Sequence, residues 1–350
     1  MPMNLYDLGY STLETLFAGW NIASTHARTV WRWLYRHIPT DFTGLPDGLP
    51  QALPAYLSAE TTLELPPVVD SQVAADGSTR KDLLQLADDE RVEVVIMRYR
   101  HRHSACISTQ VGCACDCRFC ATGQMGFVRQ LTTSEIVTQV LHAQRTLATN
   151  GQNLTNFVLM GMGEPLLNYD NTLDALRRVC DPRGMGFVER RITLSTVGIV
   201  PGIERLAGED LRINLAVSLH AATDAVRDTL LPINRRYPLD ALYNALRAYT
   251  ATTQRRVMLE WVLIDGVNAT REQAEALVAR FAGIPVHVNL IQLNPTPEFD
   301  AQPATPEAVD AFTAVLDRAG IPHTMRQRRG APITAACGQL RRRSLLEETV

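Results

Sequence analysis

The sequence lacks the features that would place it in a membrane or in an export pathway. Its 350 residues contain no apolar run of the roughly 18 to 20 residues that a membrane-spanning helix needs. Residues 1–9 lack a basic region followed by an apolar stretch, so no signal peptide is expected. Tandem repeats and low-complexity tracts are absent as well. We therefore expect a cytoplasmic protein without a membrane partner, whose 46% hydrophobic residues fill a sizeable core.

Lysine is almost absent too. Lys81 is the only lysine, so nearly all the positive charge is arginine, and the net charge is −3. Arginine suits bidentate contacts to phosphate, although a run of charges is usually only a solvated face. Three basic runs are candidates for a phosphate-binding rim: Arg98, Arg100, His101, Arg102 and His103; Arg326, Arg328 and Arg329; and Arg341, Arg342 and Arg343.

The hydrophobic pattern divides the chain into three regions. Residues 1–65 have the periodicity of helices and end in a proline-rich stretch. Residues 66–100 carry short β-like runs at 82–87 and 92–97, which suit a small sheet or a strand extension. In residues 101–350, strand and helix patterns alternate.

The alternation in the third region predicts an α/β fold, with a parallel sheet and helices outside it. The helix after the first strand begins with a predicted capping box, in which the side chains of Thr132 and Glu135 each accept from the backbone N–H of the other. Periodicity does not show whether the sheet closes into a barrel. The strand candidates lie at 105–109, 157–160, 192–195, 213–218, 257–264 and 286–290.

Five of the seven cysteines fall within fifteen residues. A reducing cytosol disfavours disulfides, so this grouping indicates a metal or catalytic site. Cys113, Cys117 and Cys120 have the spacing Cys-x3-Cys-x2-Cys, which can hold three irons of a [4Fe-4S] cluster and leave the fourth open to chelate S-adenosylmethionine (SAM). Cys115 offers other ligand sets, and zinc is the alternative metal. We expect Cys115 to be a passive thiol.

Two further segments have the residue types of a functional site. Gly161-Met-Gly-Glu164-Pro165 follows a strand candidate, where glycine permits close approach to a ligand and a carboxylate could accept from an ammonium group. An ordinary turn would explain the same residues. Cys337 lies among small residues near the end of the chain and is either functional or a small buried apolar group. Cys180, in a helix, is expected to be buried.

Six segments, in order, resemble the RlmN/Cfr family of radical SAM RNA methyltransferases over about residues 10–340, and they resemble its housekeeping branch most. The resemblance implies a partial (β/α)6 barrel (101–350), a small N-terminal helical RNA-binding domain (1–65) and a short β extension (66–100). The segments are 106–127, 161–166, 193–198, 218–220, 289–295 and 335–340.

The resemblance also implies an activity. It is methylation of carbon 2 of an adenosine in 23S rRNA, near the peptidyl transferase centre, and of the adenosine 3′ to the anticodon in some tRNAs. The implied cofactors are one [4Fe-4S] cluster on Cys113, Cys117 and Cys120, and two SAM molecules per turnover. A flavodoxin-type protein is the expected electron donor, and a monomer is the expected state.

The family's functional positions fall on residues of this chain. Cys337 would carry the methyl group, Cys106 would resolve the intermediate through a transient disulfide, and Glu93 would accept a proton. The stretch between Glu93 and Cys106 is basic here, where the family has a more acidic loop. The SAM contacts fall on Gly163, Glu164, Ser195, Ser218, Leu219, His220 and Asn294.

Two alternatives use the same residues. A Cfr-like enzyme that methylates carbon 8 shares these motifs, although the long N-terminal region and the run 121–126 favour carbon 2. A zinc-stabilised RNA-binding protein without catalysis would use the cysteine loop as a structural site and the arginines for phosphates. That alternative leaves Cys106 and Cys337 without a role.

Overall fold

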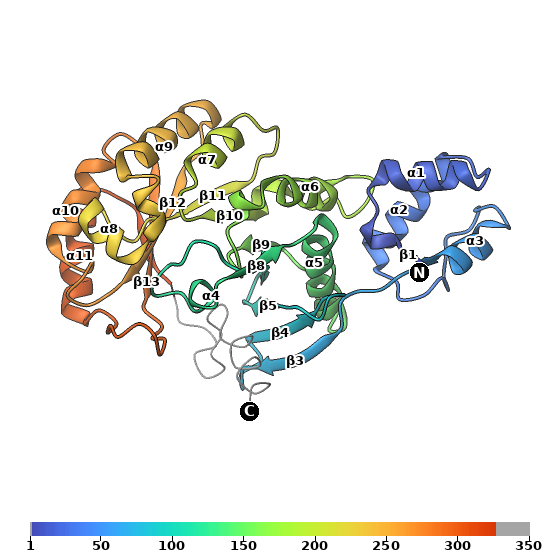
Figure 1. Cartoon of the computed structure of the whole chain (residues 1–350), viewed down its shortest axis with the longest axis horizontal. Helices are drawn as coiled ribbons and strands as arrows, with labels where there is room; N and C mark the ends of the chain where they lie inside the picture. The colour runs from blue at the N-terminus through green and yellow to red at the C-terminus, as the bar shows by residue number, and fades with distance from the viewer. Residues whose placement is uncertain (1, 327–350) are drawn as a thin grey trace.

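The computed structural model describes residues 2–326 of the chain (Figure 1). Residues 2–65 form a helical unit at one end of the molecule, blue in Figure 1, where the periodicity predicted helices. Leu13 and Phe17 of its first helix and Val30 and Leu34 of its second belong to the buried core. The elements are β1 (Met3–Asn4), η1 (Leu5–Asp7), α1 (Tyr10–Gly19), α2 (Thr25–His37), α3 (Leu53–Glu60) and β2 (Thr61–Thr62).

Ten strands form one continuous sheet in the rest of the described chain. They are β3 (Val68–Val73), β4 (Thr79–Gln85), β5 (Arg91–Arg98), β6 (His103–Cys106), β9 (Asn156–Leu159), β10 (Ile192–Thr196), β11 (Asn214–Ser218), β12 (Val257–Leu263), β13 (Val286–Gln292) and β14 (His323–Met325). The spatial order is β14-β13-β12-β11-β10-β9-β6-β5-β4-β3.

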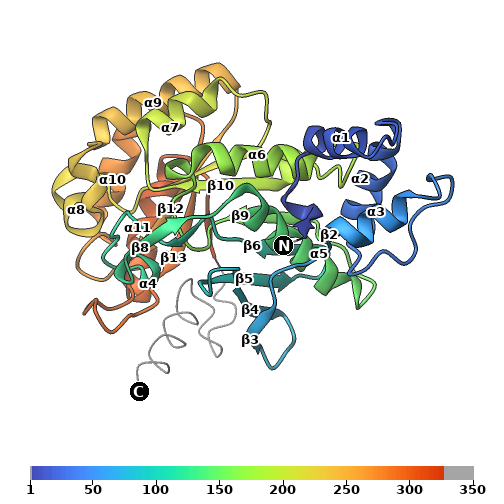
Figure 2. The same ribbon diagram turned by 45° about the vertical axis from the view of Figure 1, so that its right-hand side comes forward.

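The seven strands from β6 to β14 run parallel and curve into an open barrel, with helices on the outside (Figure 2). This confirms the α/β class, and the six strand candidates coincide with β6 and β9–β13. The seventh, β14, has the short, largely polar sequence His-Thr-Met and gave no apolar signal. The helices are α5 (Thr133–Ala148), α6 (Tyr169–Cys180), α7 (Val200–Ala207), α8 (Asp224–Leu230), α9 (Leu239–Thr253), α10 (Arg271–Arg280) and α11 (Pro306–Arg318).

The strands β3, β4 and β5 pair antiparallel and extend the barrel sheet beyond β6. A buried polar contact fastens this extension to helix α5, because His142 Nε2 lies 2.9 Å from a carboxylate oxygen of Asp82. Helix α5 begins at the predicted capping box, with Thr132 Oγ1 accepting from the Glu135 backbone N–H and the Glu135 carboxylate accepting from the Thr132 N–H. The extension and the barrel therefore share one sheet and one helix.

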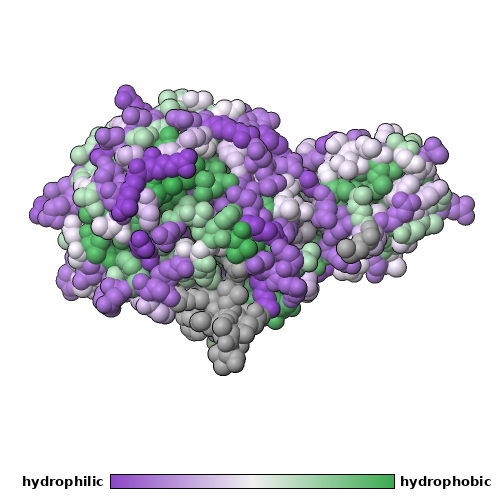
Figure 3. Space-filling view, viewed as in Figure 1, coloured by the Kyte–Doolittle hydropathy of each residue, from purple (hydrophilic) through white to green (hydrophobic). Residues whose placement is uncertain are grey.

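Side chains along each strand alternate between the helices and the inside of the barrel. On β12, Trp261 points outward and packs on Phe312 of α11, with ring centroids 5.3 Å apart, so Glu260 points inward. Hydrophilic residues cover much of the face in Figure 3, with apolar patches between them. Among residues 2–326, no helix is long and apolar enough to cross a membrane.

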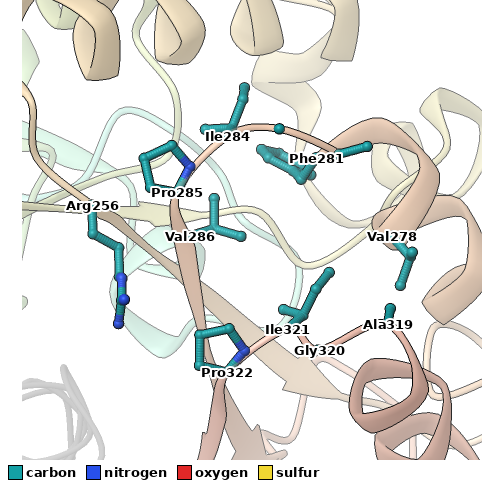
Figure 4. Close-up of a pocket in the computed structure, with 12 residues that line it drawn as sticks. Arg256, Val278, Phe281, Ile284, Pro285, Val286, Ala319, Gly320, Ile321 and Pro322 are labelled. Carbon is teal, nitrogen blue, oxygen red and sulfur yellow. The ribbon is translucent and has the colours of Figure 1, made fainter.

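A pocket at the starting ends of β12, β13 and β14 is lined mainly by apolar side chains, among them Val278, Phe281 and Ile284 (Figure 4). Arg256 is its only charged lining residue. Ligands of open parallel sheets bind at the carboxyl ends of the strands, which is the opposite end. The candidate site therefore lies at the carboxyl ends.

Candidate active site

The three expected cluster ligands lie in the loop between β7 (Gln110–Gly112) and the short helix α4 (Ala121–Gln124), which leads into β8 (Phe127–Gln130). Backbone hydrogen bonds hold this loop: the Cys113 N–H donates to Gly126 O at 2.8 Å, and the Cys120 N–H donates to Cys117 O at 3.1 Å. The Arg118 N–H donates to Leu230 O at 3.0 Å and ties the loop to helix α8. Cys113, Cys117 and Cys120 are all partly buried.

The thiols in this loop act on one another electrostatically. Burial and the neighbouring Cys120 and Cys113 raise the pKa of Cys117 well above its usual range, and burial also raises the pKa of Cys120. Cys115 is buried in the core and donates to Cys113, which lowers the pKa of Cys113 and raises that of Cys115. Several thiolates cannot share this volume without a cation, so the loop suits a metal centre.

The described side chains do not form a closed site for a single zinc ion. Among residues 2–326, no three His, Cys, Asp or Glu side chains converge so as to hold one metal ion. A tetrahedral zinc site needs four donors around a single point, whereas each cysteine of a cubane binds a different iron. The loop therefore gives no support to a closed zinc shell.

The glycines after β9 are explained by contact with the chain itself. Gly163 has φ +101°, and a Cβ there would lie 2.6 Å from the backbone nitrogen of Gln110. A Cβ on Gly161 would lie 2.6 Å from Ile107 O. The close approach that the sequence attributed to a ligand is therefore made by the segment 107–110, immediately before the cysteine loop. This packing brings Glu164 next to that loop.

The Glu164 carboxylate joins two loops at the carboxyl ends of the strands. It accepts from the Val197 N–H at 2.7 Å, after β10, and from the Leu166 N–H at 3.0 Å, while the Glu164 N–H donates to the Gln110 side chain at 2.9 Å. Burial raises the pKa of Glu164 to about 7, against the opposing effect of these hydrogen bonds. A carboxylate has about four lone-pair sites, so further donors can still bind.

The other expected SAM contacts follow the next strands. Ser195 and Ser218 are half-buried at the ends of β10 and β11, Leu219 is buried, and Asn294 is exposed after β13. His220 has φ +57°, and its Nδ1 accepts from the Val262 N–H at 3.0 Å. Burial and the charge of Arg227 lower the pKa of His220 to about 3, so the ring is neutral. Phe119, from the cysteine loop, contacts this ring edge-on at 4.8 Å.

Glu93 and Cys106 lie together on adjacent strands β5 and β6. Glu93 is buried, and one of its carboxylate oxygens lies 2.9 Å from Lys81 Nζ, whose side chain is also fully buried. Burial raises the pKa of Cys106 to about 11, with Arg326 and Lys81 acting against the rise and Glu93 adding to it. The two residues that the resemblance singled out in this part of the chain are therefore neighbours in space.

The basic runs differ from a uniform phosphate-binding rim. Arg98 donates to the Gln152 side chain and to Gly77 O, whereas Arg100, His101 and Arg102 are exposed. Arg326 contacts the barrel interior, with Nη1 3.6 Å from Glu260 Oε2 and 4.0 Å from Met160 Sδ. The remaining arginines, Arg328, Arg329, Arg341, Arg342 and Arg343, lie outside the described residues.

Cys337 also lies outside the described residues, so its position relative to Cys106 stays a prediction. Cys180 is only partly buried, at the end of α6, where desolvation raises its pKa to about 12. The expected burial is therefore only partial: the side chain packs against the core but stays partly accessible.

Two buried charged residues at the strand ends were missed by sequence reasoning. Arg227 on α8 is fully buried, and Glu260 on β12 is 3% exposed. Glu260 Oε1 accepts from Asn289 Nδ2 at 2.8 Å, whereas Oε2 has no hydrogen-bond donor among the described residues. The only sequence signals were a charge inside an apolar run, Leu259-Glu260-Trp261, and a charge at the fourth position of the short helix α8.

Comparison with known proteins decides the family. Residues 107–278 match the Radical SAM superfamily. The dual-specificity RNA methyltransferase RlmN 1 of Myxococcus xanthus is 49% identical over 338 residues, covering 97% of this chain and 94% of that protein. The probable dual-specificity RNA methyltransferase RlmN of Moorella thermoacetica is 47% identical, with 97% and 95% covered.

This chain belongs to the RlmN family of radical SAM RNA methyltransferases. A solved radical SAM methyltransferase from Sphaerobacter thermophilus has the same fold, with a TM-score of 0.91 and 45% identity over 97% of this chain and 99% of that one. Family membership implies a [4Fe-4S] cluster and SAM as cofactors. It also sets aside the alternative of a zinc-stabilised protein without catalysis.

Proposed function

We propose that this RlmN-family protein methylates carbon 2 of an adenosine in 23S rRNA and of the adenosine 3′ to the anticodon in some tRNAs. The observation that carries the proposal is that Glu93 and Cys106 lie on the adjacent strands β5 and β6, where Cys106 pairs with Val95, two residues from Glu93. A base and a thiol are the two groups needed to finish a methyl transfer that passes through a covalent adduct. The relatives' names, which speak of dual specificity, support two kinds of RNA substrate.

The residues at the strand ends fit the implied cofactors. Cys113, Cys117 and Cys120 would each hold one iron. Gly163, Glu164, Ser195, Ser218, Leu219, His220 and Asn294 line the loops where SAM would lie. When bound, the cluster supplies the electron that cleaves SAM into a radical. Glu164 would orient SAM by accepting hydrogen bonds, and neutral His220 would pack beside it without adding a second positive charge.

The chain's own groups perform the remaining steps. Carbon 2 of adenine is electron-poor and carries no leaving group, so the methyl group must arrive through a covalent protein–RNA adduct. The Cys337 thiolate takes a methyl group from one SAM, and a second SAM is used to form the adduct. Glu93 then removes the carbon 2 proton. Cys106 attacks the sulfur of Cys337, so that a sulfur–sulfur bond forms and the bond from Cys337 sulfur to the bridging carbon breaks. That carbon takes up a proton to become the methyl group, and the disulfide is left for reduction.

The N-terminal unit supports the RNA part of the proposal. Arg28, Arg32 and Arg36 are exposed and follow one another at intervals of four residues on α2, so they form a stripe along one face of that helix. A hollow between this unit and the barrel is lined by Arg36 and by Arg191, among other residues. Evenly spaced guanidinium groups can bind successive phosphates of an RNA backbone. We propose residues 1–65 as an RNA-binding domain, 66–100 as the β extension and 101–350 as the catalytic core.

Three further features are proposed with the activity. The electron donor is a flavodoxin-type protein, the active form is a monomer, and the enzyme acts in the cytoplasm, where its RNA substrates are. Each can be tested separately from the chemistry.

The order of the two cysteine steps gives the sharpest test. Cys337→Ala should yield neither methylated RNA nor a covalent adduct, because no thiol accepts the methyl group. Cys106→Ala should form the adduct and fail to release it. We expect a protein–RNA band on a denaturing gel that nuclease shortens. Cys180→Ala, a partly buried cysteine without a proposed role, is the matched control and should turn over normally. Normal turnover by Cys106→Ala, or trapping by Cys337→Ala, would refute the scheme.

A further inference from the structure

Helix α8 places the fully buried side chain of Arg227 behind the cysteine loop. The end of the helix is tied to this loop, because Leu230 O accepts from the Arg118 N–H at 3.0 Å. Arg227 Nε donates to Leu219 O, and the ring of the next residue, His220, contacts Phe119 of the loop at 4.8 Å. A permanent cation is therefore built into the wall of the proposed cluster site.

The hydrogen bonds of the Arg227 guanidinium all end on neutral oxygens. Nε donates to Leu219 O at 3.2 Å, Nη2 donates to Val197 O at 2.6 Å, and Nη1 donates to Asn234 Oδ1 at 2.8 Å. Guanidinium groups buried in proteins are usually paired with a carboxylate, because removing a charge from water is costly. Here each guanidinium nitrogen has a hydrogen-bond acceptor, and none of these acceptors is a carboxylate.

Two carboxylates lie on the far side of Asn234, whose side chain accepts from the guanidinium. Asn234 Nδ2 donates to Asp224 Oδ1 at 2.9 Å and to Asp228 Oδ1 at 2.7 Å, so the amide stands between the carboxylates and the cation. Desolvation lowers the pKa of Arg227 to about 10, which still leaves it charged at neutral pH. Gly198 keeps the space open, because a Cβ there would lie 3.3 Å from Arg227 Nη2.

We propose that Arg227 is a positioning residue that raises the reduction potential of the cluster held by Cys113, Cys117 and Cys120. Reduction adds one electron, and therefore one negative charge, to the cluster. A nearby cation in a medium of low dielectric stabilises the reduced form more than the oxidised form. The inference rests on the three-cysteine cluster proposed above.

The test is the midpoint potential of the reconstituted full-length protein without oxygen, titrated with dithionite and read by electron paramagnetic resonance. Only molecules that hold a cluster contribute to this signal, so partial loss of folding does not distort it. Arg227→Gln and Arg227→Met should lower the ratio of reduced to oxidised cluster at least tenfold at a fixed potential, which is about 59 mV for a one-electron couple. Arg227→Lys keeps a charge and should remain within a few-fold of wild type.

Asp228→Asn gives a second variant that leaves the buried arginine in place. It keeps the shape of the side chain and removes a charge that offsets Arg227, so the ratio of reduced to oxidised cluster should rise. The proposal is overturned if the neutral Arg227 variants keep the wild-type potential, if Arg227→Lys shifts as far as they do, or if Asp228→Asn fails to raise the ratio. A wild-type protein that forms no cluster signal would instead refute the cluster assignment itself.

Discussion

Among residues 2–326, Lys81 and Arg227 are fully buried cations, and the two regions that hold them surround the charge in opposite ways. In the β extension, Lys81 lies 2.9 Å from the Glu93 carboxylate. At the carboxyl ends of the barrel strands, Arg227 donates to neutral oxygens. A close ion pair cancels most of its own field, whereas an uncompensated guanidinium projects a field onto its neighbours. We propose that Glu93 of the extension accepts a proton and that the barrel mouth receives an electron.

The largest expected effects come from replacing one residue in each region, because the two variants should lose different properties. Cys117→Ala should abolish iron binding and SAM cleavage, because each of the three cysteines supplies one of only three protein ligands. Glu93→Gln should keep both and reduce RNA methylation by about 100-fold or more, the range for loss of a general base. Iron content, 5′-deoxyadenosine formation and product yield measure the three properties. Cys115→Ala is the matched control in the loop and should keep its iron. Loss of iron in Cys115→Ala, with iron retained in Cys113→Ala, would show that the ligands were assigned wrongly.

The ion pair in the extension can be broken on one side or on both. Lys81→Met leaves the Glu93 carboxylate buried without its cation and should lower the free energy of unfolding by about 3–5 kcal/mol, as measured in urea. Adding Glu93→Gln to this variant removes the buried carboxylate charge and should restore part of the lost free energy of unfolding. If Lys81→Met costs less than about 1 kcal/mol, the pair is not a compensated buried charge and the contrast with Arg227 disappears.

The barrel mouth should show its own pH dependence. The pKa of Glu164 is about 7 in the folded protein and near 4.5 when unfolded, so the folded state binds the proton more tightly. Stability from this group is therefore present at low pH and falls as pH rises from about 5 to 8, by about 3 kcal/mol at most. Unfolding of the cluster-free protein at several pH values measures this slope. Glu164→Gln should remove it, and an equal slope in both proteins would contradict the raised pKa.

The smallest expected effect concerns RNA affinity, to which we expect neither buried cation to contribute. Replacing Arg28, Arg32 and Arg36 with Gln should weaken RNA binding and reduce its salt dependence by about one unit of slope per lost phosphate contact. Arg271→Gln is the control, because that exposed arginine on α10 pairs with Glu275. A salt slope unchanged by the three substitutions would make the stripe an ordinary solvated face.

The parts of the fold that follow from local patterns were predictable. The capping box fixed the start of α5, and the apolar runs located β9–β13 within a few residues. Strand β14 escaped because its three residues are held by pairing with β13 and have little apolar character of their own. Local sequence does not encode such long-range pairing.

The candidate site also has parts that local sequence predicts and parts that it does not. The cysteine loop could be found from its spacing, because ligands close in sequence are also close in space. The Lys81–Glu93 pair and the Arg227 contacts could not be found, since they join residues whose proximity depends on sheet register and helix docking. Gly163 makes room for Gln110, a contact between distant segments that local sequence does not encode, and its contact with SAM stays a prediction.

Mass spectrometry of nucleosides tests the central claim most directly. Unmethylated 23S rRNA and tRNA would be incubated with the reconstituted protein, SAM and a reductant, with the Cys117→Ala protein as the blank. The proposed function predicts 2-methyladenosine in rRNA and, for some tRNAs, at the position 3′ to the anticodon, with none in the blank. Formation of 8-methyladenosine in place of 2-methyladenosine, or 2-methyladenosine at equal levels in the blank, would contradict it.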